Sequence, residues 1–189
     1  MKAVSRSKRQ LMIGIVQFCL FQAAWFACVL GAAHGQVPAG LMAVAAVVLL
    51  HLAMSPARAA DLALTVLAML VGLVWDSWMV RQDWVQYASP GPLPHLAPIW
   101  ILALWALFAT LLRGPLSWLH GRPLLAALLG GVGGPLSYLA AVRLGAGSFP
   151  DPASALAVLG AGWAVMTPVL IESARRLGRR LPPTSAELN

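Results

Sequence analysis

Asp76 is the residue whose setting most strongly suggests chemistry, because it lies inside an apolar run. It falls four positions before the end of Leu62–Val80, about 6 Å from that end along a helix. An ionised carboxylate in hydrocarbon is costly unless it is paired or hydrated. The expected partner is Arg143, near the end of another apolar run, and Tyr138 is placed to join the two. These residues predict either an outward-facing polar cavity for a headgroup, ion or substrate, or a structural ion pair between two helices.

Three further polar side chains within apolar runs are candidate ligand contacts. Gln17 and Gln22 lie about 140° apart on one helix, so both amides are expected to face other helices rather than lipid. Ser137 lies beside Tyr138 and can also bond back to a preceding carbonyl. For the two glutamines, bonding between helices is the first interpretation and ligand contact is the alternative.

No spacing of residues predicts catalysis or metal binding. A membrane hydrolase needs a nucleophile with a base beside it. Ser77 next to Asp76 and Ser137 next to Tyr138 are the only candidates, and neither has a histidine at matching depth. Cys19 and Cys28 have no partners at zinc-like spacing. We therefore predict no catalytic residue, no metal site and no cofactor.

Glycines and prolines mark where helices should approach closely. Gly130 and Gly134 form a GxxxG pair, with Gly131 between them, and Gly72 lies on the same helical face as Asp76. Pro135 removes a backbone donor, which predicts a kink or local unwinding. A tight helix crossing is the first interpretation; backbone groups exposed to a ligand are the alternative.

Six apolar runs of this kind occupy most of the 189 residues, in which hydrophobic residues make up 60% and charged residues 10%. A membrane span needs about 20 apolar residues. The predicted spans are Leu11–Ala33, Val37–Met54, Leu62–Val80, Pro98–Leu112, Leu124–Val142 and Ala153–Ile171. Asp151 followed by Pro152 is typical of an N-cap and first helical residue for the last span. The fold class predicted is all-α, a bundle of six transmembrane helices.

The net charge of +7 is unevenly distributed. With both termini in the cytoplasm, 11 of the 13 Lys and Arg residues lie inside, and only Arg81 and Arg143 lie outside. This bias predicts a multi-pass membrane protein, whose basic segments meet anionic lipid headgroups rather than nucleic acid. Three parts are expected: a basic cytoplasmic segment at 1–10, the membrane domain at 11–174, and a basic, disordered cytoplasmic tail at 175–189.

Four segments resemble an uncharacterised family of small bacterial inner-membrane proteins, a domain of unknown function. They are FQAAWFACVLGAA from Phe21, WDS from Trp75, APIWILALWALFAT from Ala97 and GGPLSYLAAVRLGAGSF from Gly133. The likeness covers Phe18 to Ala174, and the family's polar positions match Gln22, Asp76, Ser137, Tyr138 and Arg143. Because genes of this family often lie near ones resembling cyclopropane-fatty-acid synthases, the resemblance implies a link to envelope lipid metabolism.

Three functions remain open on these grounds. The first is a protein that binds or positions lipid, or anchors lipid-modifying enzymes, so that its partners are membrane lipids and other membrane or lipid-modifying proteins. The second is a substrate-capturing membrane subunit of a small-molecule transporter. Six helices in fewer than 200 residues, with the basic residues on the cytoplasmic side of the membrane, suit such a subunit. The third is an intramembrane lipid-modifying enzyme, which requires Asp76, Tyr138 or Ser137 to act in catalysis.

Overall fold

A computed structural model describes residues 2–181, which form six α-helices, one short 3₁₀ helix and one pair of two-residue strands. The helices are α1 (Lys2–Ala33), α2 (Val37–Met54), α3 (Arg58–Arg81), α4 (Ile99–Leu112), η1 (Ser117–Leu119), α5 (Pro123–Arg143) and α6 (Pro152–Arg180). The strands are β1 (Gln86–Tyr87) and β2 (Gly147–Ser148), which pair antiparallel. The predicted all-helical class is thus confirmed.

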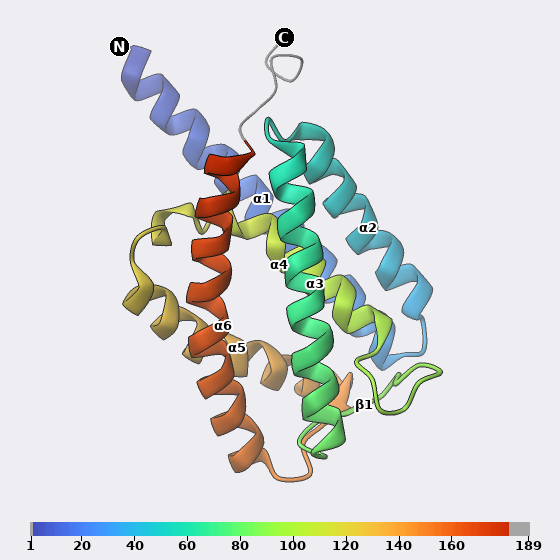
Figure 1. The fold of residues 1–189 in the computed structure, drawn as a ribbon. Coiled ribbons are helices and arrows are strands. Elements are labelled where there is room, and N and C mark those ends of the chain that lie inside the picture. Colours follow the sequence, from blue (N-terminus) through green and yellow to red (C-terminus); the bar gives the residue numbers. More distant parts are fainter. Residues whose placement is uncertain (1, 182–189) are drawn as a thin grey trace.

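Five of the six helices are long and apolar enough to cross a membrane, and α4 is the exception. Its 14 residues extend only about 21 Å, against the roughly 30 Å of a bilayer core. Most of α4 is buried, because it packs against α1, α2, α3 and α6. Figure 1 shows α4 passing behind α3 at the centre of the bundle. A helix enclosed by protein need not span the hydrocarbon by itself, so the fourth predicted span is the core helix of the bundle.

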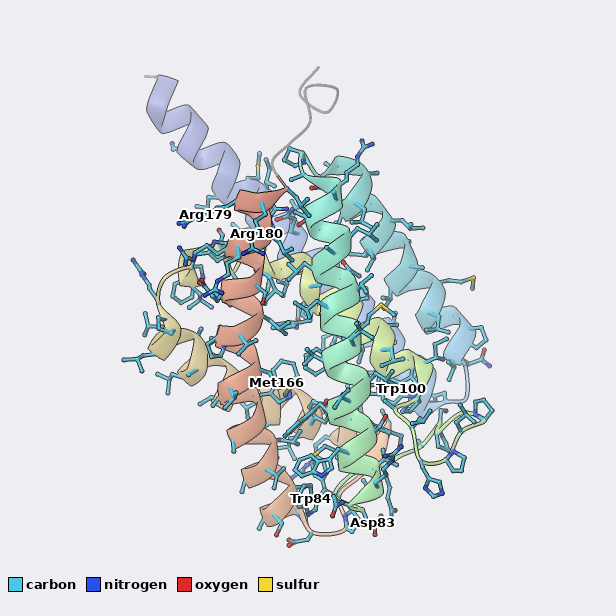
Figure 2. The ribbon with its side chains drawn as sticks, in the orientation of Figure 1. Asp83, Trp84, Trp100, Met166, Arg179 and Arg180 are labelled. Carbon is cyan, nitrogen blue, oxygen red and sulfur yellow. The ribbon has the colours of Figure 1, made fainter. Side chains whose placement is uncertain are left out.

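The bundle has two chemically different ends. We call one the basic end, because α1 begins and α6 ends there (Figure 1), and Arg179 and Arg180 lie on its surface (Figure 2). We call the other the strand end, because it carries β1 and β2; Figure 2 places Asp83 and Trp84 there.

Two helices are longer than predicted at the basic end. The first helix begins at Lys2, so the predicted basic segment at 1–10 is helical from residue 2. The last helix continues to Arg180, so residues 175–180 of the predicted basic tail are helical. Residues 182–189 of that tail lie outside the described part of the chain.

The connection between α3 and α4 folds back over the strand end. Its main-chain and side-chain groups bond to three helices: Ser89 Oγ donates to Ala32 O at 2.8 Å, and Trp100 Nε1 donates to Ser89 O at 2.9 Å. Ala97 N donates to Ser77 Oγ at 2.9 Å, which fixes the start of α4. Pairing of β1 with β2 then ties this connection to the one between α5 and α6. These two connections therefore cover the strand end of the bundle.

Helices α5 and α6 make the most extensive helix contact of the bundle. A Cβ atom on Gly130 would collide with Thr167, and one on Gly134 would collide with Trp163. Gly131 faces Ala164, whose Cβ would lie 3.3 Å from an added Cβ. Pro135 lies within an uninterrupted α5, so the local unwinding that was one of its two predicted effects does not occur.

Candidate functional site

Asp76 is fully buried near the strand end of α3 and accepts three hydrogen bonds. The hydroxyls of Tyr87 and Tyr138 each donate to Oδ1 at 2.6 Å. The indole Nε1 of Trp105 donates to Oδ2 at 2.7 Å. Both carboxylate oxygens are thus occupied by neutral donors from three other elements, β1, α5 and α4. We call these four residues the Asp76 cluster.

The predicted pairing of Asp76 with Arg143 is wrong. Arg143 is the last residue of α5 and is exposed, whereas Asp76 has its two oxygens filled by tyrosine and tryptophan donors. Burying a second charge would add a desolvation cost, and hydroxyl and indole donors satisfy the carboxylate without it. Tyr138, expected as an accessory, is one of the direct partners.

Tyr87 and Trp105 are members of the cluster that we did not predict. Tyr87 is held by the pairing of β1 with Gly147 of β2 and by an edge-to-face contact with Trp100, with ring centroids 5.3 Å apart. Burial, and then the charge of Asp76, raise the pKa of Tyr87 well above its usual value, so its hydroxyl stays protonated and donates. Trp105 packs on Gly72, where a Cβ would collide with the indole.

A cavity of about 500 Å³ adjoins the Asp76 cluster. It lies between α1, α4, α5 and α6, and its wall includes Tyr87, Tyr138 and Trp105. Asp76 itself lies behind these rings and does not line the cavity. The volume falls within the roughly 300–1,000 Å³ typical of ligand sites.

Aromatic residues dominate the wall of this cavity. All five phenylalanines and both tyrosines of the chain line it, together with four tryptophans. These aromatic residues are Phe18, Phe21, Phe26, Phe108, Phe149, Tyr87, Tyr138, Trp25, Trp100, Trp105 and Trp163. Among the side chains that the structure describes, those of residue 8 and residues 11–181, no Asp, Glu, Lys, Arg or His contributes to the lining. The interior therefore suits an apolar, uncharged group.

The cavity lining extends along α5 and reaches toward both ends of the bundle. On α5 the lining runs from Leu129 to Val142, about 20 Å of helix. At its two limits it reaches Gly147 at the strand end and Leu116, beside η1, toward the basic end. A lining of that length can accommodate an extended chain.

One side of the cavity faces outward between α1 and α5. Phe26 and Phe18 on α1 are 45% and 49% exposed, and Leu136 on α5 is 57% exposed, although all three line the cavity. Helix α1 packs on α2 and α4, while α5 packs mainly on α6, so the cavity separates these two groups. In a bilayer this side would open toward the acyl chains.

The predicted ligand-contact residues divide between the cavity and other places. Gln22, Ser137 and Tyr138 line the cavity. Gln17 does not; its Oε1 lies against Gly114, 2.7 Å from where a Cβ would be. Arg143 is also absent from the lining.

The two serines that an enzyme would require as nucleophiles, Ser77 and Ser137, have no base hydrogen-bonded to them among the described side chains. Ser77 Oγ accepts from the backbone of Ala97 and so has a structural role at the start of α4. Ser137 makes no hydrogen bond to a histidine in the described chain. The same residues contain no group of three or more His, Cys, Asp or Glu that could hold a metal ion.

A second buried acid, Asp61, was missed in the sequence. It is 5% exposed at the basic end of α3 and pairs with Arg113 Nη1 at 2.8 Å. Ser55 Oγ donates to its other oxygen, and His51 Nε2 lies 3.5 Å from that oxygen. The Asp61 cluster thus joins α2, α3 and the end of α4. The sequence did contain an indication of this pair. Asp61 lies in the first turn of α3 and Arg113 directly follows α4, so both lie at the same end of the bundle.

These features define a class: a polytopic membrane protein whose apolar helices surround an aromatic cavity backed by a buried carboxylate. The chain belongs to the family of proteins of unknown function DUF2878, whose model matches residues 14–169. That range includes the Asp76 cluster and the whole cavity lining. No curated protein and no solved structure matches the chain.

Proposed function

We propose that this protein is an integral inner-membrane protein that holds a lipid chain in its cavity and presents or positions it without catalysing a reaction. The observation that carries the proposal is the cavity itself: it has a volume of about 500 Å³, a largely aromatic and aliphatic lining without a charged residue among the described side chains, and one side open between α1 and α5. Such a lining offers apolar contact along a chain and few polar groups to orient it.

The Asp76 cluster gives this cavity a rigid wall. All three donors of the cluster are lining residues, and each is held in place by a hydrogen bond to the same carboxylate. A buried acid with all acceptors filled stabilises one arrangement of α3, β1, α4 and α5. We therefore assign Asp76 a positioning role and place ligand contact at Tyr87 and Tyr138.

The proposed orientation places the basic end in the cytoplasm. Arg122, Arg179 and Arg180 are exposed at that end, where they would meet anionic headgroups. The Asp76 cluster then lies in the periplasmic half of the membrane. Exposed basic side chains at the same end are also available to recruit lipid-modifying enzymes, which we propose as partners.

The geometry favours a lipid over the two other functions considered. A transporter subunit for a water-soluble substrate would need polar groups throughout its cavity, whereas this lining is mostly aromatic and aliphatic. An enzyme would need an activated nucleophile, and Ser77 is engaged with Ala97.

Native mass spectrometry of the purified protein tests the proposal when a cavity-filling variant is included. Gly133 lines the cavity and a Cβ there would meet nothing within 4 Å, so Gly133→Phe fills the space without a backbone collision. Gly14→Phe is the matched control, because Gly14 also has open space but lies outside the lining. We expect a lipid adduct on the wild type and on Gly14→Phe, and its loss from Gly133→Phe. Absence of any adduct, or equal adducts on all three proteins, would reject the proposal.

A further inference from the structure

We infer that the bound chain carries an uncharged oxygen, a hydroxyl or a carbonyl, which bonds to Thr167 and Trp163 deep in the cavity. This inference rests on the proposed function and specifies the chemical class of the ligand. Candidates of this class are long-chain alcohols, ketones and hydroxylated chains.

Two buried polar atoms without partners carry the inference. Thr167 is 2% exposed and Trp163 is 9% exposed, yet Thr167 Oγ1 and Trp163 Nε1 have no hydrogen-bond partner within the described residues. Both residues line the cavity, one helical turn apart on α6. Buried donors and acceptors are nearly always paired in native proteins, so a pair of unpaired groups on one cavity wall points to a ligand group.

The chemistry of these two groups selects the ligand atom. An indole N–H only donates, and a threonine hydroxyl both donates and accepts. A ligand oxygen can accept a hydrogen bond from Trp163 Nε1 and also form a hydrogen bond with Thr167 Oγ1, as acceptor or as donor. Such an oxygen satisfies both groups at once. A hydroxyl or a carbonyl oxygen meets this requirement. Gln22 and Ser137, which also line the cavity and make no side-chain hydrogen bond within residues 2–181, add further polar contacts along the same chain.

The electrostatics of the wall require that this oxygen be uncharged. No ionisable Asp, Glu, Lys, Arg or His lies on the lining among the described residues. Asp76 is linked to Trp163 through the stacked ring of Trp105, and both of its oxygens are filled by donors of the Asp76 cluster. A carboxylate or an ammonium group would therefore be buried without a counter-charge, which the low-dielectric interior disfavours strongly.

The depth of Thr167 excludes an ordinary phospholipid headgroup at this position. Thr167 lies 15 residues after the start of α6 at Pro152, about 22 Å along the helix. That places it within the apolar part of the bundle and away from either end of α6. A phospholipid keeps its headgroup at the interface, so the oxygen recognised here must belong to the chain region of the ligand.

Photo-crosslinking of four chain-matched probes to the full-length protein in nanodiscs tests the inference. The probes are C16 diazirine compounds ending in an alcohol, a carboxylic acid, an amine or a methyl group. We expect the alcohol to bind most tightly. Replacing Thr167 by Val, which keeps the shape but removes the hydroxyl, should weaken alcohol binding about two- to tenfold. Thr167→Ser keeps the hydroxyl and should retain most of the binding, and neither change should alter binding of the methyl-ended probe.

The outcomes separate this inference from the proposed function. Labelling of the cavity by all four probes with equal affinity would overturn the inference and leave a generic lipid site. Tighter binding of the acid or the amine than of the alcohol would overturn it as well. Absence of cavity labelling by every probe would reject both proposals. If Thr167→Val fails to fold, the ranking of the four probes on the wild type decides the question by itself.

Discussion

Trp105 and Trp163 stack face to face, with ring centroids 4.8 Å apart and 12° between their planes. Trp105 donates to Asp76, and Trp163 carries one of the unpaired groups in the cavity. The stack therefore links a buried carboxylate at the strand end to the wall where a ligand would lie. Trp105 cannot rotate without breaking its hydrogen bond to Asp76. A substitution at Asp76 should therefore also shift the indole ring of Trp163.

Replacing Asp76 by Ala should destabilise the fold strongly, since Tyr87, Tyr138 and Trp105 would each lose their acceptor in a buried site. Each unpaired buried donor costs about 1–3 kcal/mol, so we expect the free energy of unfolding to fall by at least ~3 kcal/mol. Asp76→Asn keeps the volume and one acceptor oxygen and should fall between Asp76→Ala and the wild type. Thermal or SDS-induced unfolding in detergent measures these differences.

Arg143→Ala is the control for the Asp76 series. Arg143 is exposed and does not contact Asp76, so its removal should change the free energy of unfolding by no more than about 0.5 kcal/mol. A loss comparable to that of Asp76→Ala would mean that the two residues form the ion pair after all, and the assignment of the cluster would be wrong.

The long helices were predictable because hydrocarbon requires every backbone group to be bonded within the segment, which leaves long apolar runs in the sequence. Val37–Met54 was predicted with the bounds that the structure has. The N-cap at Asp151 was also correct: its carboxylate accepts from Ala153 N at 3.2 Å. These features depend on residues close together in the chain.

The partners of Asp76 were not predictable from local pattern. Tyr87 reaches Asp76 because β1 pairs with β2, whose residues follow about 60 positions later, and no periodicity records that pairing. Trp105 looked like one more apolar residue in a hydrophobic run. Arg143 was the obvious choice on charge alone, yet neutral donors satisfy a buried carboxylate without desolvating a second ion. Both tyrosines of the chain bind this acid, and the scarcity of tyrosine was the one signal available.

Arg113→Ala should destabilise the basic end of the bundle. It removes the cationic partner of Asp61, which is 5% exposed, and leaves that charge with Ser55 and His51 alone. Removing one partner of a buried ion pair lowers the free energy of unfolding by roughly 3–5 kcal/mol. Because Arg113 is partly exposed, we expect a loss at the lower limit of that range. Unfolding in detergent measures it, with Arg122→Ala, an exposed arginine of the same end, as the matched control. Equal effects of the two changes would show that the pair adds nothing.

The N-cap of α6 should make stability depend on pH. Hydrogen bonding from the Ser154 hydroxyl, and then from the backbone amides of Ser154 and Ala153, lowers the pKa of Asp151 below its usual value. Because the pKa is lowered in the folded state, the stabilisation is present above the unfolded-state pKa of about 3.9 and is lost as the pH falls through the folded-state pKa. Thermal unfolding between about pH 7 and pH 3 measures this dependence.

Asp151→Asn is the control for that measurement, because asparagine caps a helix but does not titrate. The variant should unfold at nearly the same temperature as the wild type at neutral pH and should lose less stability on acidification. Since Asp151 is exposed, the difference should be small. Identical acid profiles for the two proteins would show that other carboxyl groups account for the whole dependence.

Gly130 and Gly133 offer a comparison of two neighbouring glycines on one helix. A Cβ on Gly130 would collide with Thr167 and with the backbone of Trp163, so Gly130→Ala must separate α5 from α6 or displace the cavity wall. A Cβ on Gly133 meets nothing within 4 Å, and alanine favours a helix over glycine by about 1 kcal/mol. We therefore expect Gly130→Ala to lower and Gly133→Ala to raise or preserve the unfolding temperature, and only the first to weaken binding of an alcohol-ended chain. A Gly130→Ala protein with full stability would show that α5 and α6 do not cross as closely as the glycines indicate.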